Sequence, residues 1–256
     1  MTTDFSQFDN AIATPIGKQA PANRRHIGII GASGAGKTTW ACQAPDALII
    51  LTEPQAAGRI QEANPEARVV SLENLDALPA CLEWLNTKIF SPESEWRPKT
   101  IVLDSVTEMC RLIQDIVDQD KGSEWTFKQW KKYEDGCMRM MRQFRNLPCN
   151  LIGIFLDDIS RGDDSSTGAR RLSVGKKSMS PKIAALFDLV FWAEVKDKGE
   201  DGMVYALRTC GGVYRGYLYE QGKGHPALGK WLDSSEMKPG NILQTINSYK
   251  KDTSNE

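Results

Sequence analysis

The chain has 256 residues, 25% of them charged and 41% hydrophobic, which is ordinary for a globular protein with a sizeable core. Its 32 Lys and Arg residues are balanced by 33 Asp and Glu residues, so the net charge of -1 excludes overall charge as the cause of binding to a polyanion. The six Cys and two His residues have no spacing typical of a zinc knuckle or a CxxC redox site, which excludes both local motifs.

The N-terminal segment, residues 1–25, is polar and lacks the apolar stretch of a signal peptide. We predict an arm there, whose order would have to come from a partner. No later apolar run is long enough for a membrane-spanning helix, so we expect a cytoplasmic protein with reduced thiols and no membrane partner. The folded core is expected over residues 26–235, followed by a polar tail over residues 236–256.

Short, continuous apolar segments alternate with segments of helical spacing in the first part of the chain. Strands that are apolar throughout are typical of a parallel sheet covered on both faces. The alternation therefore predicts an α/β fold with a doubly wound, mainly parallel sheet and helices on both faces. The predicted strands are 26–30, 47–51, 68–72, 100–103 and 150–156, and the predicted helices are 37–44, 74–90, 105–120 and 127–146.

The chain changes character after residue 156. Residues 157–180 are rich in Gly, Ser, Thr and charged residues, which predicts a long loop that is functional or disordered. A short helix at 183–187 and strands at 189–195 and 203–209 follow, and residues 213–219 are a candidate for a further strand. Because the turn between the strands at 189–195 and 203–209 is short, we predict antiparallel pairing there.

A glycine-rich turn between the first strand and the first helix satisfies the pattern GxxxxGK[ST]. Glycines at positive φ bring backbone N–H groups against phosphate oxygens, and the following helix adds its dipole. Lys37 is expected to reach the β and γ phosphates of ATP, and Thr38 is expected to offer its hydroxyl to Mg²⁺. The alternative is a glycine-rich turn that binds nothing. The predicted cofactor-binding residues are Gly31, Ser33, Gly34, Ala35, Gly36, Lys37, Thr38 and Thr39.

Two acidic residues follow predicted strands at the sheet edge where Lys37 lies. Asp104 ends the segment TIVLD, where open α/β sheets place their ligands, so we expect it to bind Mg²⁺ together with Thr38. A helix N-cap is the alternative role for Asp104. Glu53 follows the strand at 47–51, and we expect it to act with Lys37 in catalysis by accepting the proton of the attacking water. An exposed loop glutamate is the alternative for Glu53.

The segments GASGAGKTT, ALIILTEP, TIVLDSVTE and NLIGIFLDD occur in this order, and together they resemble the ATPase core of RecA-type recombinases. More narrowly, residues 26 to about 220 resemble the small, core-only, phage-encoded members described as nucleotide-binding or single-strand annealing proteins. The resemblance implies a RecA-like fold, ATP and Mg²⁺ as cofactors, Glu53 as the catalytic glutamate and Asp104 on the metal-binding strand. It also implies a homo-oligomer that acts on single-stranded DNA, with a single-strand-binding protein as a further partner, in the cytoplasm of a phage host.

The chain departs from that family where the strand at 150–156 ends. RecA carries a polar amide there and many small phage relatives carry a histidine, whereas this chain has Asp157 and Asp158. A carboxylate that faces a phosphate repels it unless Mg²⁺ or a basic residue intervenes, so we expect the coupling between ATP and DNA to differ. The chain also lacks RecA's large N-terminal helix and separate C-terminal domain, so the resemblance does not imply polymerisation through those parts.

The resemblance places a DNA-binding loop at residues 159–180. Its glycines would let the backbone approach a phosphodiester chain, and its basic side chains could displace counterions. A solvated surface loop is the alternative. Residues 127–145 are a second basic candidate, but their aromatic and Met side chains recur at helical spacing, so we favour core packing for those side chains. The candidate DNA contacts in the loop are Arg161, Arg170, Arg171, Lys176 and Lys177.

In rings and filaments of this superfamily a neighbouring copy usually completes the ATP site with a basic residue. Arg208, Arg215 and Lys223 are the candidates for this trans-acting group, and an ordinary surface or ion-pair role is the alternative for each. 

Three functions are therefore open. The first is a phage recombination ATPase that anneals or exchanges single-stranded DNA. The second is a nucleotide-dependent switch or loader that acts on a protein partner without binding DNA, which the acidic pair Asp157 and Asp158 favours. The third is a small-molecule kinase, for which Arg170 and Arg171 as part of a mobile lid are the only indication.

Overall fold

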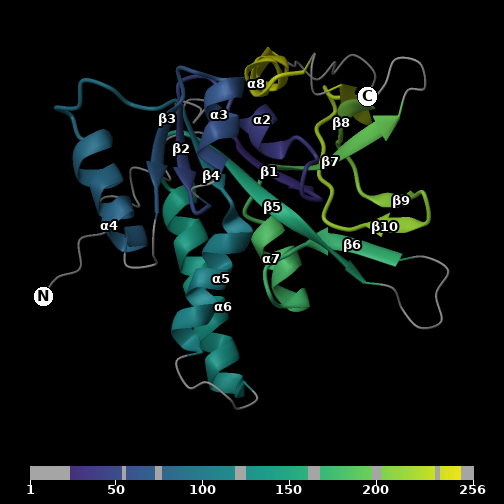
Figure 1. Cartoon of the computed structure of the whole chain (residues 1–256), viewed down its shortest axis with the longest axis horizontal. Helices are drawn as coiled ribbons and strands as arrows, with labels where there is room; N and C mark the ends of the chain where they lie inside the picture. Colours follow the sequence, from purple (N-terminus) through teal and green to yellow (C-terminus); the bar gives the residue numbers. More distant parts are fainter. Residues whose placement is uncertain are drawn as a thin grey trace, which may run out of the picture.

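A mixed β-sheet forms the centre of the computed structural model (Figure 1). The structure describes residues 24–53, 56–72, 77–118, 125–160, 168–197, 203–233 and 237–248. Within these residues, the main run of strands has the order β11-β8-β7-β1-β5-β4-β2-β3. In chain order these strands are β1 (His26–Gly31), β2 (Ala47–Leu51), β3 (Arg68–Ser71), β4 (Thr100–Asp104), β5 (Asn150–Ser160), β7 (Leu189–Asp197), β8 (Met203–Arg208) and β11 (Trp231–Asp233).

The pairing of these strands confirms the predicted α/β class. The pairs from β7 through β1, β5, β4 and β2 to β3 are parallel, whereas β8 pairs antiparallel with β7 and with β11. Because β5 lies between β1 and β4, the ends of β1 and β4 are two strands apart, or about 10 Å, at one edge of the sheet.

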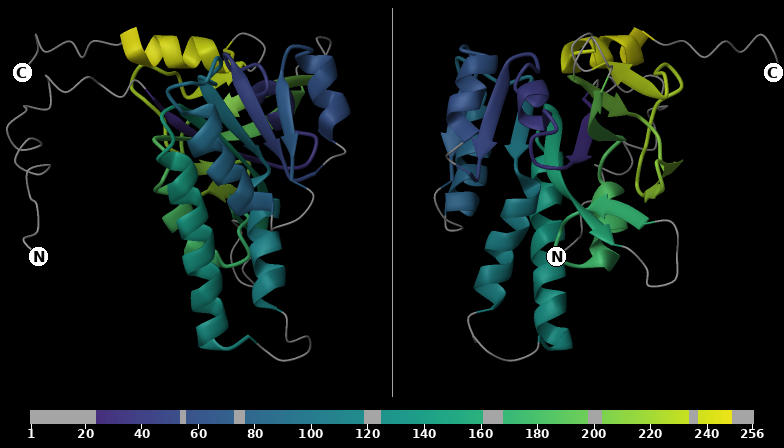
Figure 2. Two further views of the ribbon diagram at one scale, coloured as in Figure 1. Left: turned by 90° about the vertical axis from the view of Figure 1, so that its left-hand side faces the viewer. Right: turned by 45° about the vertical axis from the view of Figure 1, so that its right-hand side comes forward.

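Helices cover both faces of the sheet, as the sequence predicted. One face is covered by α2 (Lys37–Ala41), α3 (Ala57–Ala63) and α8 (Pro239–Ser248). The other face is covered by α4 (Ala77–Trp84), which continues as the π-helix η3 (Leu85–Ile89), and by α5 (Val106–Val117), α6 (Phe127–Arg145), η4 (Lys177–Met179) and α7 (Ser180–Ala184). In Figure 2, α5 and α6 extend side by side well beyond the sheet.

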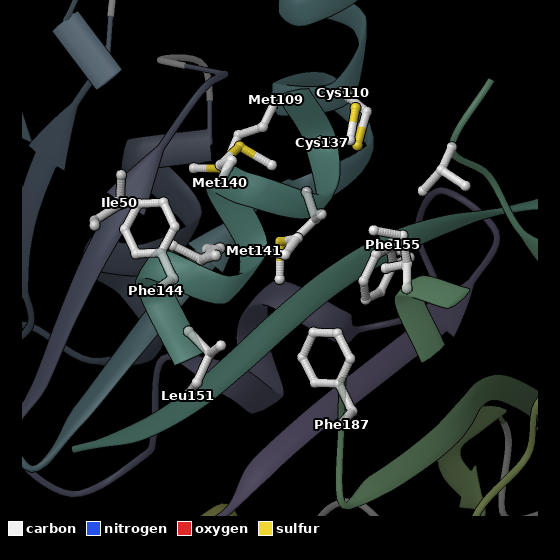
Figure 3. Close-up of a cluster of buried hydrophobic side chains, with 14 of the residues drawn as sticks. Ile50, Met109, Cys110, Cys137, Met140, Met141, Phe144, Leu151, Phe155 and Phe187 are labelled. Atoms are coloured by element: carbon white, nitrogen blue, oxygen red, sulfur yellow. The ribbon is translucent and has the colours of Figure 1, made fainter. Parts of the chain in front are cut away.

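The core under α5 and α6 is rich in sulfur and aromatic groups (Figure 3). Phe144 of α6 lies beside Ile50 of β2, Met140 lies beside Met109 of α5, and the thiol groups of Cys110 and Cys137 lie next to each other between the two helices. Core packing of the predicted stripe on α6 is therefore confirmed. None of the helices described is long and apolar enough to cross a membrane.

The segment predicted as a long loop, residues 157–180, instead contains a β-hairpin, so that prediction is wrong. Strand β5 continues to Ser160, and β6 (Gly168–Leu172) pairs antiparallel with it. β6 also pairs with β10 (Tyr217–Tyr219), which pairs with β9 (Gly212–Tyr214). Ion pairs of Arg170 and backbone pairing hold the polar part of the hairpin, and Leu172 anchors it in the hydrophobic core. Residues 161–167 lie outside the described residues.

The structure describes part of the predicted N-terminal arm and part of the predicted C-terminal tail. Residues 1–23 of the predicted arm lie outside the described residues, while Arg25 donates its backbone N–H to Asn150 Oδ1 at 2.8 Å. The predicted tail contains α8, whose Ile242, Leu243 and Ile246 side chains are buried, so residues 239–248 are part of the core. Trp40 Nε1 adds a 2.9 Å hydrogen bond to Met237 O.

Candidate functional site

A polar cavity of about 250 Å³ lies at the carboxyl ends of the parallel strands. It is formed by the loop after β1, the ends of β2 and β4, and side chains from β5, α3 and β8. Its lining residues are Ser33, Gly34, Ala35, Gly36, Lys37, Thr38, Thr39, Glu53, Ala56, Arg59, Asp104, Ser105, Ile154, Leu156 and Tyr205. The structure thus brings Lys37, Asp104 and Glu53 together in one cavity.

Glycines give the loop after β1 its path around the cavity. Gly34 and Gly36 adopt φ values of 79° and 77°, in the left-handed region that side chains with a Cβ atom rarely adopt. At Gly31 a Cβ atom would lie 2.6 Å from Ala193 O, so only glycine fits between β1 and β7. The loop can therefore turn its backbone N–H groups toward a bound anion.

Lys37 is held on the floor of this loop. Its side chain is buried, and Nζ donates hydrogen bonds to Gly31 O at 2.8 Å and to Ala32 O at 2.6 Å. Burial lowers the pKa of the Lys37 ammonium, while the nearby carboxylates of Asp157, Asp104 and Glu53 act in the opposite direction. A phosphate would supply this buried cation with a negatively charged partner.

Asp104 and Thr38 form the pair of oxygen groups expected for a metal. Thr38 Oγ1 donates a 2.7 Å hydrogen bond to Asp104 Oδ2, and Asp104 is only 8% exposed. Burial raises the pKa of Asp104; the Thr38 hydrogen bond opposes this shift and the nearby Glu53 carboxylate adds to it.

This donor set fits Mg²⁺ bound together with a phosphate. Mg²⁺ is usually bound in proteins by one or two carboxylates together with substrate phosphates and water. The described residues contain no cluster of three His, Cys, Asp or Glu side chains that could hold a metal ion. The N-cap alternative for Asp104 is not observed, because Ser105 caps α5 by accepting the N–H of Glu108 at 3.1 Å.

Glu53 lies at the rim of the cavity, directly after β2. Its Oε1 is 3.5 Å from the hydroxyl of Ser105, and its side chain is exposed. Its neighbour Thr52 is fixed to the end of β4: Thr52 N donates to Asp104 O at 2.9 Å, and Ser105 N donates to Thr52 Oγ1 at 3.0 Å. These bonds tie the backbone that carries Glu53 to the backbone that carries Asp104.

Sequence patterns missed several side chains that line the cavity, of which Arg59 and Tyr205 are the largest. Arg59 follows Glu53 on α3, and its charge acts on Asp104. Tyr205 comes from β8, and its ring lies so close to Gly36 that a Cβ atom there would be 2.8 Å from Cδ1. Recognition of a helix over residues 57–63 would have placed Arg59 near Glu53. No pattern in the neighbouring sequence indicates that Tyr205 lies beside the loop.

The candidate DNA contacts are placed differently from the prediction. The side chain of Arg170 is only 13% exposed and donates to Asp157 Oδ2 at 2.6 Å, to Glu194 Oε1 at 3.2 Å and to the Tyr219 hydroxyl at 2.8 Å. It therefore cannot contact DNA in this arrangement, and it is the basic group that neutralises Asp157.

The remaining basic residues of the hairpin region have mixed surroundings. Arg171 donates to Ser160 Oγ and lies 3.8 Å from Glu220 Oε1. Lys176 lies 3.9 Å from Glu134 Oε2 and over the Trp130 ring, whereas Lys177 is exposed. Arg161 lies outside the described residues.

The three candidates for the trans-acting basic group differ in whether they contact their own fold. Arg208 is 1% exposed and lies within its own chain among the rings of Tyr214, Tyr219 and Trp231, so it does not reach a neighbour in this arrangement. Lys223 Nζ donates to Phe187 O at 2.8 Å, which ties it to its own fold. Arg215 occupies the exposed turn between β9 and β10 and is the one of the three that faces solvent without such a contact to the core.

Comparison with known proteins matches the chain to one protein family. The family described as AAA domain matches residues 23–227, which include every element of the cavity. A search of the curated proteins found no match.

Proposed function

Because this chain belongs to the AAA domain family, we propose that it is a P-loop ATPase that binds ATP with Mg²⁺ in the cavity after β1. The observation that carries the proposal is the convergence of Lys37, the Thr38–Asp104 pair and Glu53 on one polar cavity. The three groups come from the ends of β1, β4 and β2, where open parallel sheets bind their ligands.

The loop residues would bind the triphosphate. Residues 33–39 line the cavity and would offer backbone N–H groups to the phosphates, and Lys37 would exchange its carbonyl partners for phosphate oxygens. Thr38 and Asp104 would hold Mg²⁺, which when bound supplies positive charge to the phosphate oxygens. The buried ammonium of Lys37 and the polarised loop then favour the charge that develops as the terminal phosphate is transferred to water.

Glu53 would orient the attacking water and accept its proton. Its carboxylate borders the cavity and is close to the Ser105 hydroxyl, which can keep it in place. A positioned general base of this kind typically contributes a factor of about 10² to 10⁴ to the rate.

As the effector of this ATPase we propose single-stranded DNA, within a phage recombination system that anneals or exchanges strands. Support comes from the resemblance to the small phage recombinases and from the position of β5, which runs from the sheet beside the phosphate loop into the β5–β6 hairpin. Arg171 and Lys177 are the described residues of the hairpin region that remain candidates for contact with phosphates. Assembly of copies with Arg215 at the ATP site of a neighbour belongs to the same proposal.

The second candidate is a nucleotide-dependent switch on a protein partner. It is favoured because carboxylates of the same chain neutralise the two arginines of the hairpin: Arg170 is paired with Asp157 and Glu194, and Arg171 is close to Glu220. A surface whose arginines are already paired attracts a polyanion less strongly.

A salt titration separates the two candidates. The probe is a fluorescein-labelled single-stranded oligonucleotide, added to the protein with a non-hydrolysable ATP analogue and Mg²⁺. DNA binding should weaken steeply between about 50 and 200 mM salt, and Lys177→Ala should weaken it further at low salt. Absence of binding at 50 mM salt, with the analogue shown to be bound, contradicts the DNA proposal and leaves the protein switch.

A further inference from the structure

A groove with an apolar floor runs along α6, on the part of the helix pair that extends beyond the sheet. It consists of two adjoining cavities of about 490 Å³ each, which share Ile113, Gly136 and Arg139. One cavity continues between α4 and α6, past Leu78, Leu82 and Met140, and the other continues along α5, past Ile116 and Val117. From Lys128 to Gln143 the groove follows α6 for roughly 22 Å.

One wall of this groove is basic. Lys128, Lys131, Lys132 and Arg139 line the part beside α5, and Asp135 is the acidic residue among them. The four basic side chains are exposed, and no described residue forms an ion pair with any of them. The groove therefore combines apolar surface with an excess of positive charge, which fits an acidic segment that carries apolar side chains.

The rings of α6 argue against nucleic acid as the occupant. Single strands usually bind where bases can stack on aromatic rings. Trp130 and Tyr133 instead pack with Trp125 and belong to the core cluster, with Lys176 over the Trp130 ring. Phe127 is 84% exposed but lines neither cavity. The floor of the groove is aliphatic.

We propose that this groove binds the N-terminal segment of its own chain, residues 1–16. That segment carries Asp4 and Asp9 and has no Lys or Arg, so its side-chain charge is opposite to that of the groove. In the sequence, Phe5 and Phe8 stand between the two aspartates and Ile12 follows them, and these residues would supply apolar side chains for the floor of the groove. Burial of two Phe and one Ile side chain is the main favourable contribution that such a contact can make.

The start of the described chain lies within reach of the groove. Arg24 Nη1 donates to Leu147 O at 3.0 Å, just beyond the end of α6 and about one helical turn from Gln143. The seven residues from 17 to 23 can span about 23 Å when extended, so residues 1–16 can lie along the groove. A tether of this length gives the segment an effective concentration in the millimolar range, which favours binding within one chain over binding to another copy.

Photo-crosslinking in the 256-residue chain tests this proposal. Benzoylphenylalanine replaces Phe8, the protein is irradiated, and the attachment sites are mapped by mass spectrometry in the monomeric band of a denaturing gel. We expect crosslinks to peptides that contain residues 113–117 or 136–143. Lys131→Glu and Lys132→Glu should each lower the crosslink yield at least about fivefold, while Lys131→Arg should restore it and Lys230→Glu, on the β11 side of the sheet, should not change it.

Several outcomes would overturn the proposal. Crosslinks that map to other surfaces, or a yield that is insensitive to Lys131→Glu and Lys132→Glu, exclude the groove as the binding site. Crosslinks found only in a covalent dimer identify a second copy as the occupant. If the two charge reversals abolish binding of a labelled single-stranded oligonucleotide and leave the crosslink intact, the groove is a nucleic-acid surface. Nucleotide binding, measured on every variant, serves as the control for folding because no groove residue lines the phosphate cavity.

Discussion

Thr38 Oγ1 and Asp104 Oδ2 are 2.7 Å apart, although the two residues are separated by 66 positions in the chain. This hydrogen bond connects the phosphate loop after β1 to the end of β4, across the intervening strand β5. It places two oxygen ligands side by side beside the buried Lys37 ammonium. The metal and phosphate sites are therefore assembled by the sheet and do not depend on a single loop.

The burial of Asp104 favours its protonated form for stability, whereas binding of Mg²⁺ requires the ionised carboxylate. Since the pKa of Asp104 is raised above 3.8 in the fold, the folded chain binds this proton more tightly than the unfolded chain does. Its contribution to stability is therefore present at low pH and is lost as the pH rises through the folded pKa, so the ionised form is unfavourable at pH 7. Asp104→Asn keeps an oxygen that can accept the Thr38 hydrogen bond and should raise the Tm of the ligand-free protein at pH 7.

Thermal unfolding at several pH values measures this effect. The Tm advantage of Asp104→Asn should shrink as the pH falls toward 4, and the variant should lose the extra stabilisation that Mg²⁺ gives in the presence of an ATP analogue. A variant that is less stable than the unmodified protein at pH 7 would show that the ionised Asp104 is favourable in the fold.

Lys37→Ala should weaken binding of an ATP analogue at least about a hundredfold, equivalent to about 2.7 kcal/mol. The reason is that the ammonium is the one basic group of the phosphate loop itself, and it lies buried among the groups that would surround the phosphates. Isothermal titration calorimetry with the analogue and Mg²⁺ measures the loss, with Lys177→Ala as a control outside the cavity. Unchanged affinity in Lys37→Ala would place the nucleotide elsewhere.

The sequence predicted the parts of the site that have local patterns. The phosphate loop, Asp104 and Glu53 could be located because glycine spacing and the ends of apolar strands are visible in short segments. Parallel strands end at a common edge, so their convergence followed from the predicted sheet. The hydrophobic stripe of α6 was recognisable for the same reason, since its period is that of a helix.

Features that depend on distant contacts could not be predicted in this way. Tyr205 reaches the loop only because β8 pairs with β7, and Arg170 is mostly withdrawn from solvent only because Asp157 and Glu194 are brought beside it. From composition alone, a polar segment held by buried ion pairs cannot be distinguished from a solvated loop. In α8 the apolar stripe is short, so its docking could not be inferred from the sequence.

Arg170→Ala should destabilise the protein by about 3–5 kcal/mol, because it leaves two buried carboxylates, Asp157 and Glu194, without their partner. Urea unfolding followed by circular dichroism measures the free energy of unfolding. Lys177→Ala is the matched control on the exposed surface, and it should change that free energy by less than about 0.5 kcal/mol. A loss below about 1 kcal/mol for Arg170→Ala would mean that Arg170 is free to bind an external anion.

The thiols should differ sharply in reactivity. Burial raises the pKa of Cys42 and Cys81 to about 11 and that of Cys149 to about 12, so that at pH 8 only about one thiol in a thousand, or fewer, is ionised at these positions. Cys110 and Cys137 are buried as well, whereas Cys210 is partly exposed. Iodoacetamide at pH 8 should therefore modify Cys210 first, as read by peptide mass spectrometry. Early modification of Cys81 would contradict the described packing of α4, and all six thiols should react in urea.

The most direct test of the central claim is hydrolysis of ATP by Glu53→Gln in a single-turnover experiment. The account predicts that the variant binds ATP with Mg²⁺ about as tightly as the unmodified protein, while the rate of phosphate release falls at least about a hundredfold. Hydrolysis in the unmodified protein should also require Mg²⁺. Hydrolysis at the normal rate in Glu53→Gln, or in the unmodified protein without Mg²⁺, would contradict the assignment of this cavity as the catalytic site.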